Sequence, residues 1–571
     1  MSRNVAEAMV SVLEKTGAQH CYGIPGDTLN HFTDALSRSA ISFVHMRHEE
    51  AGAFAAGAEA LLADRLTLCA GSCGPGSLHF INGIWESNRN RAPVVLIASQ
   101  IVRDQLGFEF PQEVDFRAVY AAGTVFCEEI RTPEQAVRMT VMAAQAAMAR
   151  RGVAVLIVPA DIFAAKAENT SGYRPHFARP VVTPNASEIA LMADMLNAGK
   201  RITIFGGSGC EDAHDQIVRL ADALKAPVAR TSRAKDFLEH DNPFDVGMTG
   251  MIGAEGGLHA VTSCDTLLLL GCNFAWSQYY PDKARIIQLD IDPVHLGRRH
   301  PVDLGVAGDV GATLDALLPH ITPRTDRAFL DASLKVAHEA QHKLDERAVT
   351  GGKGTIHPQY LAATVARHAA PNAVFTADGG SPMVWVLRHV PSTGQNRTLV
   401  SLSHGTMANA MPQALGAQKA FPDRQVISFS GDGGIAMLLG DLLTSIQENL
   451  PIKVVVFNNS SLNFVELEQK VEGLLDHYTN LINPDFSHVA SAIGLWSRQV
   501  ENPVDLDAAV QEFLAVPGPA LLDVVTNEFE LVMPPDIHAK EVAGMALYAA
   551  KGLLSGRAGD VAHLIGGALR R

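Results

Sequence analysis

Residues 431–459 place glycines, an aspartate and two asparagines at the ends of two expected strands. The segment reads GDGGIAMLLGDLLTSIQENLPIKVVVFNN, which predicts a tight turn over 431–434, a helix over 435–449 and a strand over 453–457. A right-handed crossover would make this strand parallel to VISFS before the turn. Asp432 and Asn459 then emerge at carboxyl ends, where α/β sheets bind ligands. The glycines let a diphosphate approach closely, and backbone N–H groups at the helix start can donate to it. The side-chain oxygens of Asp432 and Asn459 are ligands that suit Mg²⁺.

The elements that must position this segment repeat along the chain. Short apolar runs alternate with helix-length segments up to about residue 161, which predicts a parallel sheet covered on both faces. A polar stretch with three prolines, at about 164–186, reads as a linker. Two further α/β units follow, ending near residues 318 and 527. A helix over 326–347 and a flexible joint over 351–354 separate them.

We therefore predict an α/β protein with three doubly wound parallel-sheet domains and a C-terminal helical tail. The predicted bounds are 1–165, 186–320 and 355–530 for the domains and 536–571 for the tail.

Composition narrows the class of function. The 571 residues carry a formal net charge of −15, which disfavours a nucleic-acid partner that would need a basic face. No apolar run approaches the roughly 20 residues of a membrane span. The N-terminus lacks a continuous signal-peptide core, and the seven cysteines are scattered without a C-x-x-C pair. We expect a reduced, cytoplasmic environment.

The 431–459 segment resembles the thiamine-diphosphate signature, in which G-D-G is followed by N-N. Here 24 residues, 434–457, separate the two parts. The resemblance implies Mg²⁺ held by Asp432, Asn459 and the carbonyl of Ser461. It also implies cofactor contacts from the residues around these ligands, namely Gly433, Gly434, Ser460, Leu462, Asn463, Phe464 and Val465.

Two other segments resemble parts of the same family. In RHEE, Glu49 matches the carboxyl group that tautomerises the aminopyrimidine of the cofactor, whereas Glu50 is expected only to complement a helix dipole. In SHGTMANAMPQALGA, Met407 matches the side chain that bends the cofactor, and the carbonyl of Gly405 would accept from its amino group, with Thr406 between them. His79 matches a position near the reacting centre in related oxidases.

The central unit resembles the FAD-binding middle domain of the pyruvate oxidase group. Its GGSG turn is a weak nucleotide signal alone, but it is joined by NPFDVGMTGMIG, GCNFAWSQYYP, QLDIDPVHLG and VAGD. The resemblance implies FAD contacts from residues at strand ends and turns: Gly207, Ser208, Gly209, Arg233, Thr249, Gly250, Met251, Ile252, Cys272, Asn273, Phe274, Ala275, Trp276, Asp290 and Asp309.

Across essentially its whole length the chain resembles the pyruvate:quinone oxidoreductases of the thiamine-diphosphate- and FAD-dependent pyruvate oxidase family. This implies oxidation of pyruvate to acetate and CO₂, with electrons passing through FAD to membrane quinone. Phe464 matches a phenylalanine that assists electron transfer. Four residues later, Glu468 stands where acetolactate synthases carry tryptophan, which favours redox chemistry over carboligation.

Three alternatives remain open at this stage. The chain could be a pyruvate oxidase that uses O₂ and phosphate, a carboligase of the acetolactate-synthase type with a structural FAD, or an idle paralogue that only binds nucleotides. The substrate also stays open, because Phe110-Pro111-Gln112-Glu113 has proline where the family has phenylalanine.

Partners follow from the resemblance and from the tail. The family implies a homo-oligomer, at least a dimer and by expectation a tetramer, with Glu49 and Asp432 brought together across a subunit interface. In the tail, Val561, Leu564, Ile565 and Ala568 share one helical face that ends in two arginines. Such a helix can lie on an anionic lipid surface, which would make the protein peripheral to the inner face of the cell membrane.

Overall fold

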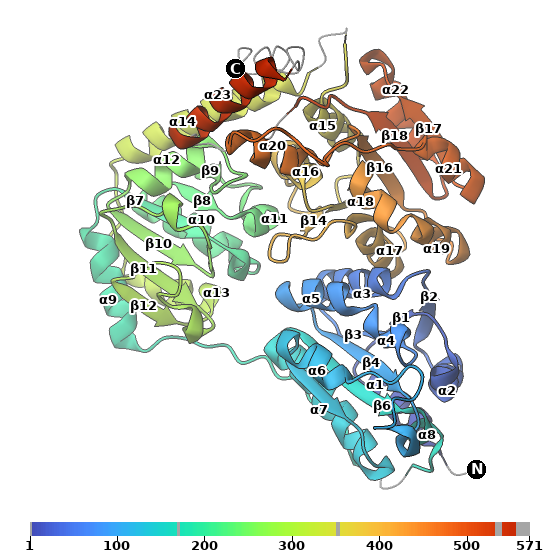
Figure 1. The fold of residues 1–571 in the computed structure, drawn as a ribbon. Coiled ribbons are helices and arrows are strands. Elements are labelled where there is room, and N and C mark those ends of the chain that lie inside the picture. The colour runs from blue at the N-terminus through green and yellow to red at the C-terminus, as the bar shows by residue number, and fades with distance from the viewer. Residues whose placement is uncertain (1–2, 168–171, 350–353, 531–538, 556–571) are drawn as a thin grey trace.

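The computed structural model describes residues 3–167, 172–349, 354–530 and 539–555. Its described residues form three sheets of six strands, one in each of three domains, and the neighbouring strands within these sheets are parallel (Figure 1). This confirms the predicted fold class of three parallel α/β domains.

The N-terminal sheet has the strand order β2-β1-β3-β4-β6-β5. Its strands are β1 His20–Gly23, β2 Ser42–His45, β3 Thr67–Gly71, β4 Val94–Gln100, β5 Phe126–Glu129 and β6 Val153–Pro159. Its helices are α1 Val5–Glu14, α2 Asn30–Ser37, α3 Glu49–Ala63, α4 Pro75–Leu78, α5 Ile81–Arg89, α6 Phe116–Tyr120, α7 Ala136–Arg150 and α8 Ala160–Ala164.

The central sheet has the order β12-β11-β10-β7-β8-β9. Its strands are β7 Ile202–Gly206, β8 Val228–Arg230, β9 Asp245–Met248, β10 Thr266–Leu270, β11 Arg285–Asp290 and β12 Leu304–Ala307. Its helices are α9 Ala186–Ala198, α10 His214–Leu224, α11 Lys235–Leu238, α12 Glu255–Ser263, α13 Val310–Leu317 and α14 Ala328–Arg347, the last of which confirms the helix predicted over 326–347.

The C-terminal sheet has the order β14-β13-β15-β16-β18-β17. Its strands are β13 Val374–Ala377, β14 Arg397–Val400, β15 Val426–Gly431, β16 Lys453–Asn458, β17 Trp496–Val500 and β18 Ala520–Val525. The helices that follow in the chain are α15 Pro358–His368, α16 Ser381–His389, α17 Ala410–Ala420, α18 Asp432–Met437, α19 Leu442–Gln447, α20 Asn463–Val471, α21 Phe486–Ile493, α22 Pro503–Ala515 and α23 Ala539–Leu554.

The central strands of each sheet are apolar on both faces, which is why they read as continuous hydrophobic runs. In β4, Val94 and Leu96 belong to one core cluster, whereas Val95 and Ile97 belong to another on the opposite face. The edge strands are different. Strands such as β5 (FCEE) and β17 (WSRQV) are only half-buried and carry charged residues, so hydrophobic patterning did not single them out.

The helix predicted over 435–449 is wrong in its extent. Helix α18 already begins at Asp432, and a 3₁₀ turn over Leu439–Asp441 separates it from α19. The interruption has a tertiary cause: the carboxylate of Asp441 accepts from the Thr444 hydroxyl at 2.9 Å and from the backbone N–H of Arg47, in the N-terminal domain, at 2.9 Å.

Helices α3 and α17 join the N-terminal and C-terminal domains. Both are rich in alanine and glycine, and a Cβ built on Gly416 would overlap the backbone carbonyl of Ala55. Small residues therefore let the two helix backbones approach closely. One apolar core runs across the junction, from Phe54 in α3 to Leu415 in α17.

The tail prediction is only partly covered by the described residues. Helix α23 packs on α20, with Lys551 donating to the carbonyl of Gly473 at 2.7 Å and Tyr548 to Asp476 at 3.2 Å. The predicted lipid-facing residues beyond 555, and most of the joint predicted over 351–354, lie outside the described residues. Among the described helices, none is both long and apolar enough to cross a membrane.

Candidate active site

Three neighbouring strands of the C-terminal sheet end in polar residues at one edge. Asp378 follows β13, Asp432 follows β15, and Asn459 follows β16, and these strands are adjacent and parallel. The carboxyl edge of this sheet therefore gathers the residues that the sequence singled out at 432 and 459, together with one carboxylate, Asp378, that it did not.

Asp432 is a buried carboxylate, 3% exposed, held by three N–H donors. Its oxygens accept from the backbone of Gly433 at 2.8 Å, the backbone of Ser460 at 2.7 Å and the amide of Asn483 at 2.8 Å. Burial raises the pKa of Asp432, partly offset by these hydrogen bonds. None of the ion pairs among the described residues includes Asp432. An uncompensated buried carboxylate of this kind fits a cation.

The other predicted metal ligands lie in the loop after β16. Asn459 turns its amide oxygen back to accept from the N–H of Ser461 at 3.1 Å. The Ser461 hydroxyl donates to Glu466 at 2.5 Å, and Glu466 pairs with the buried Lys470, so the loop is tied to α20. A carboxylate, an amide oxygen and a backbone carbonyl are hard donors that fit Mg²⁺.

The loop that carries Met407, residues 405–410 (the Met407 loop), packs against the turn 431–434. A Cβ built on Gly433 would lie 3.2 Å from the Met407 methyl and 2.9 Å from a Leu462 methyl, so the two loops are in close contact at this glycine. The buried Ser401 hydroxyl accepts from the N–H groups of Gly405 and Thr406, each at 3.0 Å. The structure thus brings together three segments predicted to hold thiamine diphosphate.

Glu49 begins helix α3 and is 7% exposed. Its carboxylate lies 3.1 Å from Nδ1 of His79, whose ring stacks on that of His48 with centroids 4.9 Å apart. Glu49 and His79, two separately predicted residues, are therefore in direct contact. Within the described residues, Glu49 makes no hydrogen bond or ion pair with Asp432 or Asn459.

Glu50 does more than complement the dipole of α3. Its carboxylate accepts from the amide of Asn82 at 2.6 Å, and the same amide lies 3.0 Å from the Thr406 hydroxyl. The Asn82 oxygen lies 2.8 Å from Nε2 of His404. Asn82 therefore connects the start of α3 with the Met407 loop, across the domain junction.

Phe464 and Glu468 lie on helix α20, which follows the loop 459–461 with the predicted metal ligands (the metal loop). Phe464 is half-buried against the core of the C-terminal domain, and Glu468 is exposed. Val465 is 44% exposed on the same helix, and the amide of Asn463 donates to the carbonyl of Glu528 at 3.1 Å.

The residues predicted for FAD lie at the carboxyl edge of the central sheet. Gly209 donates its N–H to the carbonyl of Gly271 at 3.1 Å, so the turns after β7 and β10 are in contact, with Ser208 beside them. Gly250, at φ +104°, packs on Phe274. The Thr249 hydroxyl is buried and has no hydrogen-bond partner among the described residues, which fits a donor or acceptor on a bound nucleotide.

Several predicted FAD residues already have structural roles. Cys272 and Phe274 lie in the apolar core of the central domain, where Phe274 packs 5.3 Å from Trp276, centroid to centroid. Asp309 caps α13. Asp290 contacts His295 at 3.2 Å, and Asn273 contacts Arg299 at 2.8 Å. The Ile252 carbonyl accepts from Arg388 at 3.1 Å. Met251 is 39% exposed, and Ala275 is also exposed.

The segment that departs from the family lies on the surface of the N-terminal domain. Phe110 is 41% exposed and lines a shallow pocket with Gly107, Glu109 and Glu113. Gln112, at φ +70°, accepts from the Cys73 thiol at 3.0 Å.

Sequence reasoning missed Asp378, Ser401 and Asn82. Asp378 had a local signal, since the strand AVFTA runs directly into D-G-G. Asn82 had none, because it meets Thr406 across 324 residues of chain. Ser401 lies four and five residues before the amides that it binds, but just outside the segment that begins at Ser403.

Three family models match the chain, one in each domain. They are described as the thiamine pyrophosphate enzyme N-terminal TPP binding domain, over residues 3–119, the central domain, over 189–317, and the C-terminal TPP binding domain, over 378–524.

Similar whole proteins are also found. A putative thiamine pyrophosphate-containing protein, YdaP, of Bacillus subtilis is 33% identical over 96% of both chains. Pyruvate oxidase of Lactiplantibacillus plantarum is 29% identical over 91% of this chain and 88% of its own. Acetolactate synthase isozyme 1 large subunit of Escherichia coli is 29% identical over 94% and 97%. The chain therefore belongs to the thiamine-pyrophosphate-dependent enzyme family, with pyruvate oxidase and acetolactate synthase among its relatives.

Proposed function

We propose that this enzyme oxidises pyruvate and water to acetate and CO₂, using thiamine diphosphate, Mg²⁺ and FAD, and delivers the two electrons to membrane quinone. Bound thiamine diphosphate supplies a nucleophilic carbon and an electron sink for decarboxylation. Asp432, Asn459 and Ser461 would hold the metal, and Met407 would shape the bound cofactor. Glu49 would hold the proton at the pyrimidine nitrogen. For FAD, the turns at 207–209 and 249–252 and the carboxylate of Asp290 are the proposed contacts.

The observation that carries the redox proposal is the position of Arg233. It lies in a 3₁₀ turn after β8, at the central edge predicted for FAD, and its guanidinium donates to the Ser403 hydroxyl at 3.1 Å and to the Asn90 carbonyl at 3.4 Å. Ser403 is two residues before Gly405, at which the Met407 loop begins. Electron transfer between two cofactors requires adjacent sites, and this contact supports that adjacency.

The relatives leave two other activities to be tested against this one. A pyruvate oxidase and an acetolactate synthase are similar to the chain at the same 29% identity. The exposed Glu468, in place of the tryptophan of acetolactate synthases, supports oxidation over carboligation.

Pyruvate should bleach the flavin absorbance of the purified, FAD-loaded enzyme under anaerobic conditions, provided that thiamine diphosphate and Mg²⁺ are present. We expect acetate as the product when a quinone is the acceptor. Acetyl phosphate with peroxide would indicate the O₂- and phosphate-using reaction, and acetolactate would indicate carboligation. Cofactor-loaded enzyme whose flavin stays oxidised would rule out the redox proposal, and if it also formed no acetolactate it would favour the idle paralogue.

We also propose a homo-oligomer in which a second subunit completes the site. This proposal rests on the resemblance to the pyruvate oxidase family, in which the positions of Glu49 and Asp432 are brought together across a subunit interface. Sedimentation of the purified protein as a monomer at assay concentration, with full activity, would contradict it.

A peripheral membrane location is proposed from the amphipathic pattern at the C-terminus. Deleting residues 556–571 leaves α23 with its contacts to α20, so the oligomer and the pyruvate-dependent flavin reduction should be unchanged. Binding to vesicles of anionic phospholipid and turnover with a lipid-embedded quinone should both fall. Vesicle binding equal to that of the full chain would contradict a lipid role for the tail.

A further inference from the structure

Asp378 is a carboxylate at the carboxyl end of β13 and is 1% exposed. No ion pair among the described residues includes it, and burial raises its pKa to about 7. Burying a carboxylate without a nearby cation costs free energy, which hydrogen bonds to the carboxylate must offset.

The two oxygens of Asp378 bind the starts of two different helices. Oδ1 accepts from the N–H of Ala410, the first residue of α17, at 2.9 Å. Oδ2 accepts from the N–H of Gly431, which precedes α18, at 3.1 Å. Backbone N–H groups at helix starts lack partners within their own helix. One side chain thus ties the end of the Met407 loop to the turn that carries Asp432.

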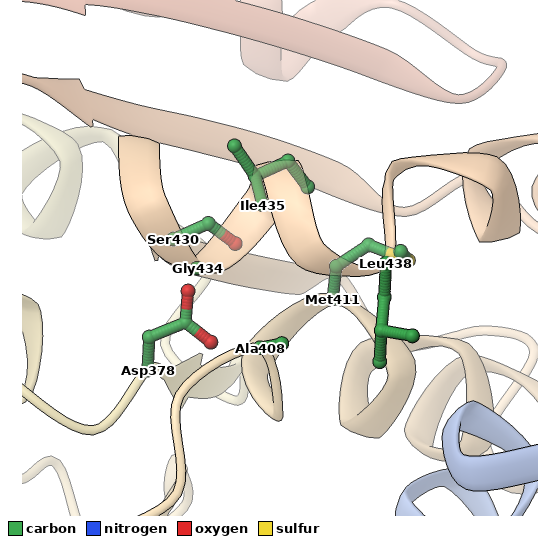
Figure 2. Close-up of a pocket in the computed structure, with 7 residues that line it drawn as sticks. All are labelled: Asp378, Ala408, Met411, Ser430, Gly434, Ile435 and Leu438. Carbon is green, nitrogen blue, oxygen red and sulfur yellow. The ribbon is translucent and has the colours of Figure 1, made fainter. Parts of the chain in front are cut away.

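The packing around Asp378 is tight enough to fix this spacing. A Cβ built on Gly434 would overlap Oδ2 of Asp378, so α18 lies directly against the carboxylate. The next residue, Gly379, donates its N–H to the Thr406 carbonyl at 3.1 Å and lies within 3.1 Å of the Asn409 side-chain oxygen. Figure 2 shows the Asp378 carboxylate beside Gly434 and Ser430, with Ala408 close by.

We propose that Asp378 is a positioning residue that holds loop 405–410 and turn 431–434 at the separation that thiamine diphosphate binding requires. It rests on the thiamine part of the proposed function and not on FAD or quinone. Asp378 itself would touch neither the metal nor the reacting atoms. Its loss should therefore raise the cofactor concentration needed for half-saturation more than it lowers kcat at saturating cofactor.

The test is thiamine diphosphate affinity, measured with Mg²⁺ by calorimetry and by quenching of intrinsic tryptophan fluorescence. Asp378→Ala leaves two buried N–H groups unmet and should weaken binding about 10- to 100-fold. The isosteric Asp378→Asn, which turns one acceptor into a donor, serves if the alanine variant does not fold. Val374→Ala, a buried change in the same strand, is the control for lost stability and should stay within about 3-fold of the unchanged protein.

A double-mutant cycle tests the contact directly. Gly434→Ala alone should weaken cofactor binding, because its methyl group would displace the Asp378 carboxylate. In the Asp378→Ala background the same change should cost less than it does alone, because the overlapping oxygen is gone while any direct effect of the methyl group on the cofactor turn is common to both backgrounds. Additive effects, or an Asp378→Ala protein that binds the cofactor like the unchanged one, would overturn the inference. If the unchanged protein bound no thiamine diphosphate, the proposed function itself would fail.

Discussion

Replacing Glu49 by glutamine should lower kcat for pyruvate by about 10²- to 10⁴-fold, the range typical of losing a positioned acid–base group. The carboxylate is buried at the start of α3 and hydrogen-bonded to His79, so it is held in one orientation. Glutamine keeps its size but cannot exchange a proton with the pyrimidine nitrogen of the cofactor. The measurement is steady-state turnover, together with NMR of proton–deuterium exchange at the thiazolium carbon.

Glu50→Gln is the matched control for this experiment. Glu50 sits next in the helix and binds Asn82, and an amide oxygen can still accept that hydrogen bond. We expect less than about a 10-fold loss of turnover and unchanged proton exchange. Equal losses in the two variants would assign the effect to the packing of α3 and not to proton transfer by Glu49.

Replacing Asp432 by asparagine should weaken Mg²⁺ binding by at least roughly 10- to 100-fold. That range follows the loss of a residue that only supports a metal ligand, whereas this change removes the charge of the proposed ligand itself. Asparagine keeps one oxygen, but it removes the negative charge and places an NH₂ group against N–H donors such as that of Ser460. Affinity for thiamine diphosphate should fall with it, because a Mg²⁺ held at Asp432 would supply positive charge that favours diphosphate binding. Titration of Mg²⁺ against cofactor-induced fluorescence quenching measures both.

Asp441→Asn controls for the loss of any buried aspartate from this region. Asp441 is 1% exposed, yet its carboxylate binds Thr444 and the backbone of Arg47 and not the metal loop. This variant should lose stability and keep its Mg²⁺ affinity within about 3-fold. An Asp432→Asn enzyme with undiminished Mg²⁺ affinity would remove Asp432 from the metal site.

Features of the site could be predicted from the sequence when the interacting residues are close together in the chain. Asp432 and Asn459 belong to one strand–helix–strand crossover, so a local pattern places both at the same sheet edge. The helix between them is broken at Asp441 by a contact with the N-terminal domain, and local propensity carries no information about that contact. Edge strands such as β5 escaped prediction because a half-buried strand lacks a continuous apolar run.

The three-domain α/β fold could be predicted from the apolar runs of the chain, because buried parallel strands must be apolar on both faces. The local pattern over 431–459 predicts a diphosphate and metal site, and the resemblance of RHEE to a family segment singled out Glu49. How these motifs are held together becomes visible in the folded chain: Asp378 binds two helix starts, Ser401 binds the Met407 loop, and Asn82 joins two domains. The bonds of Asp378 and Asn82 connect residues far apart in the chain, so their partners are set by packing and not by spacing, whereas Ser401 binds amides only four and five residues away.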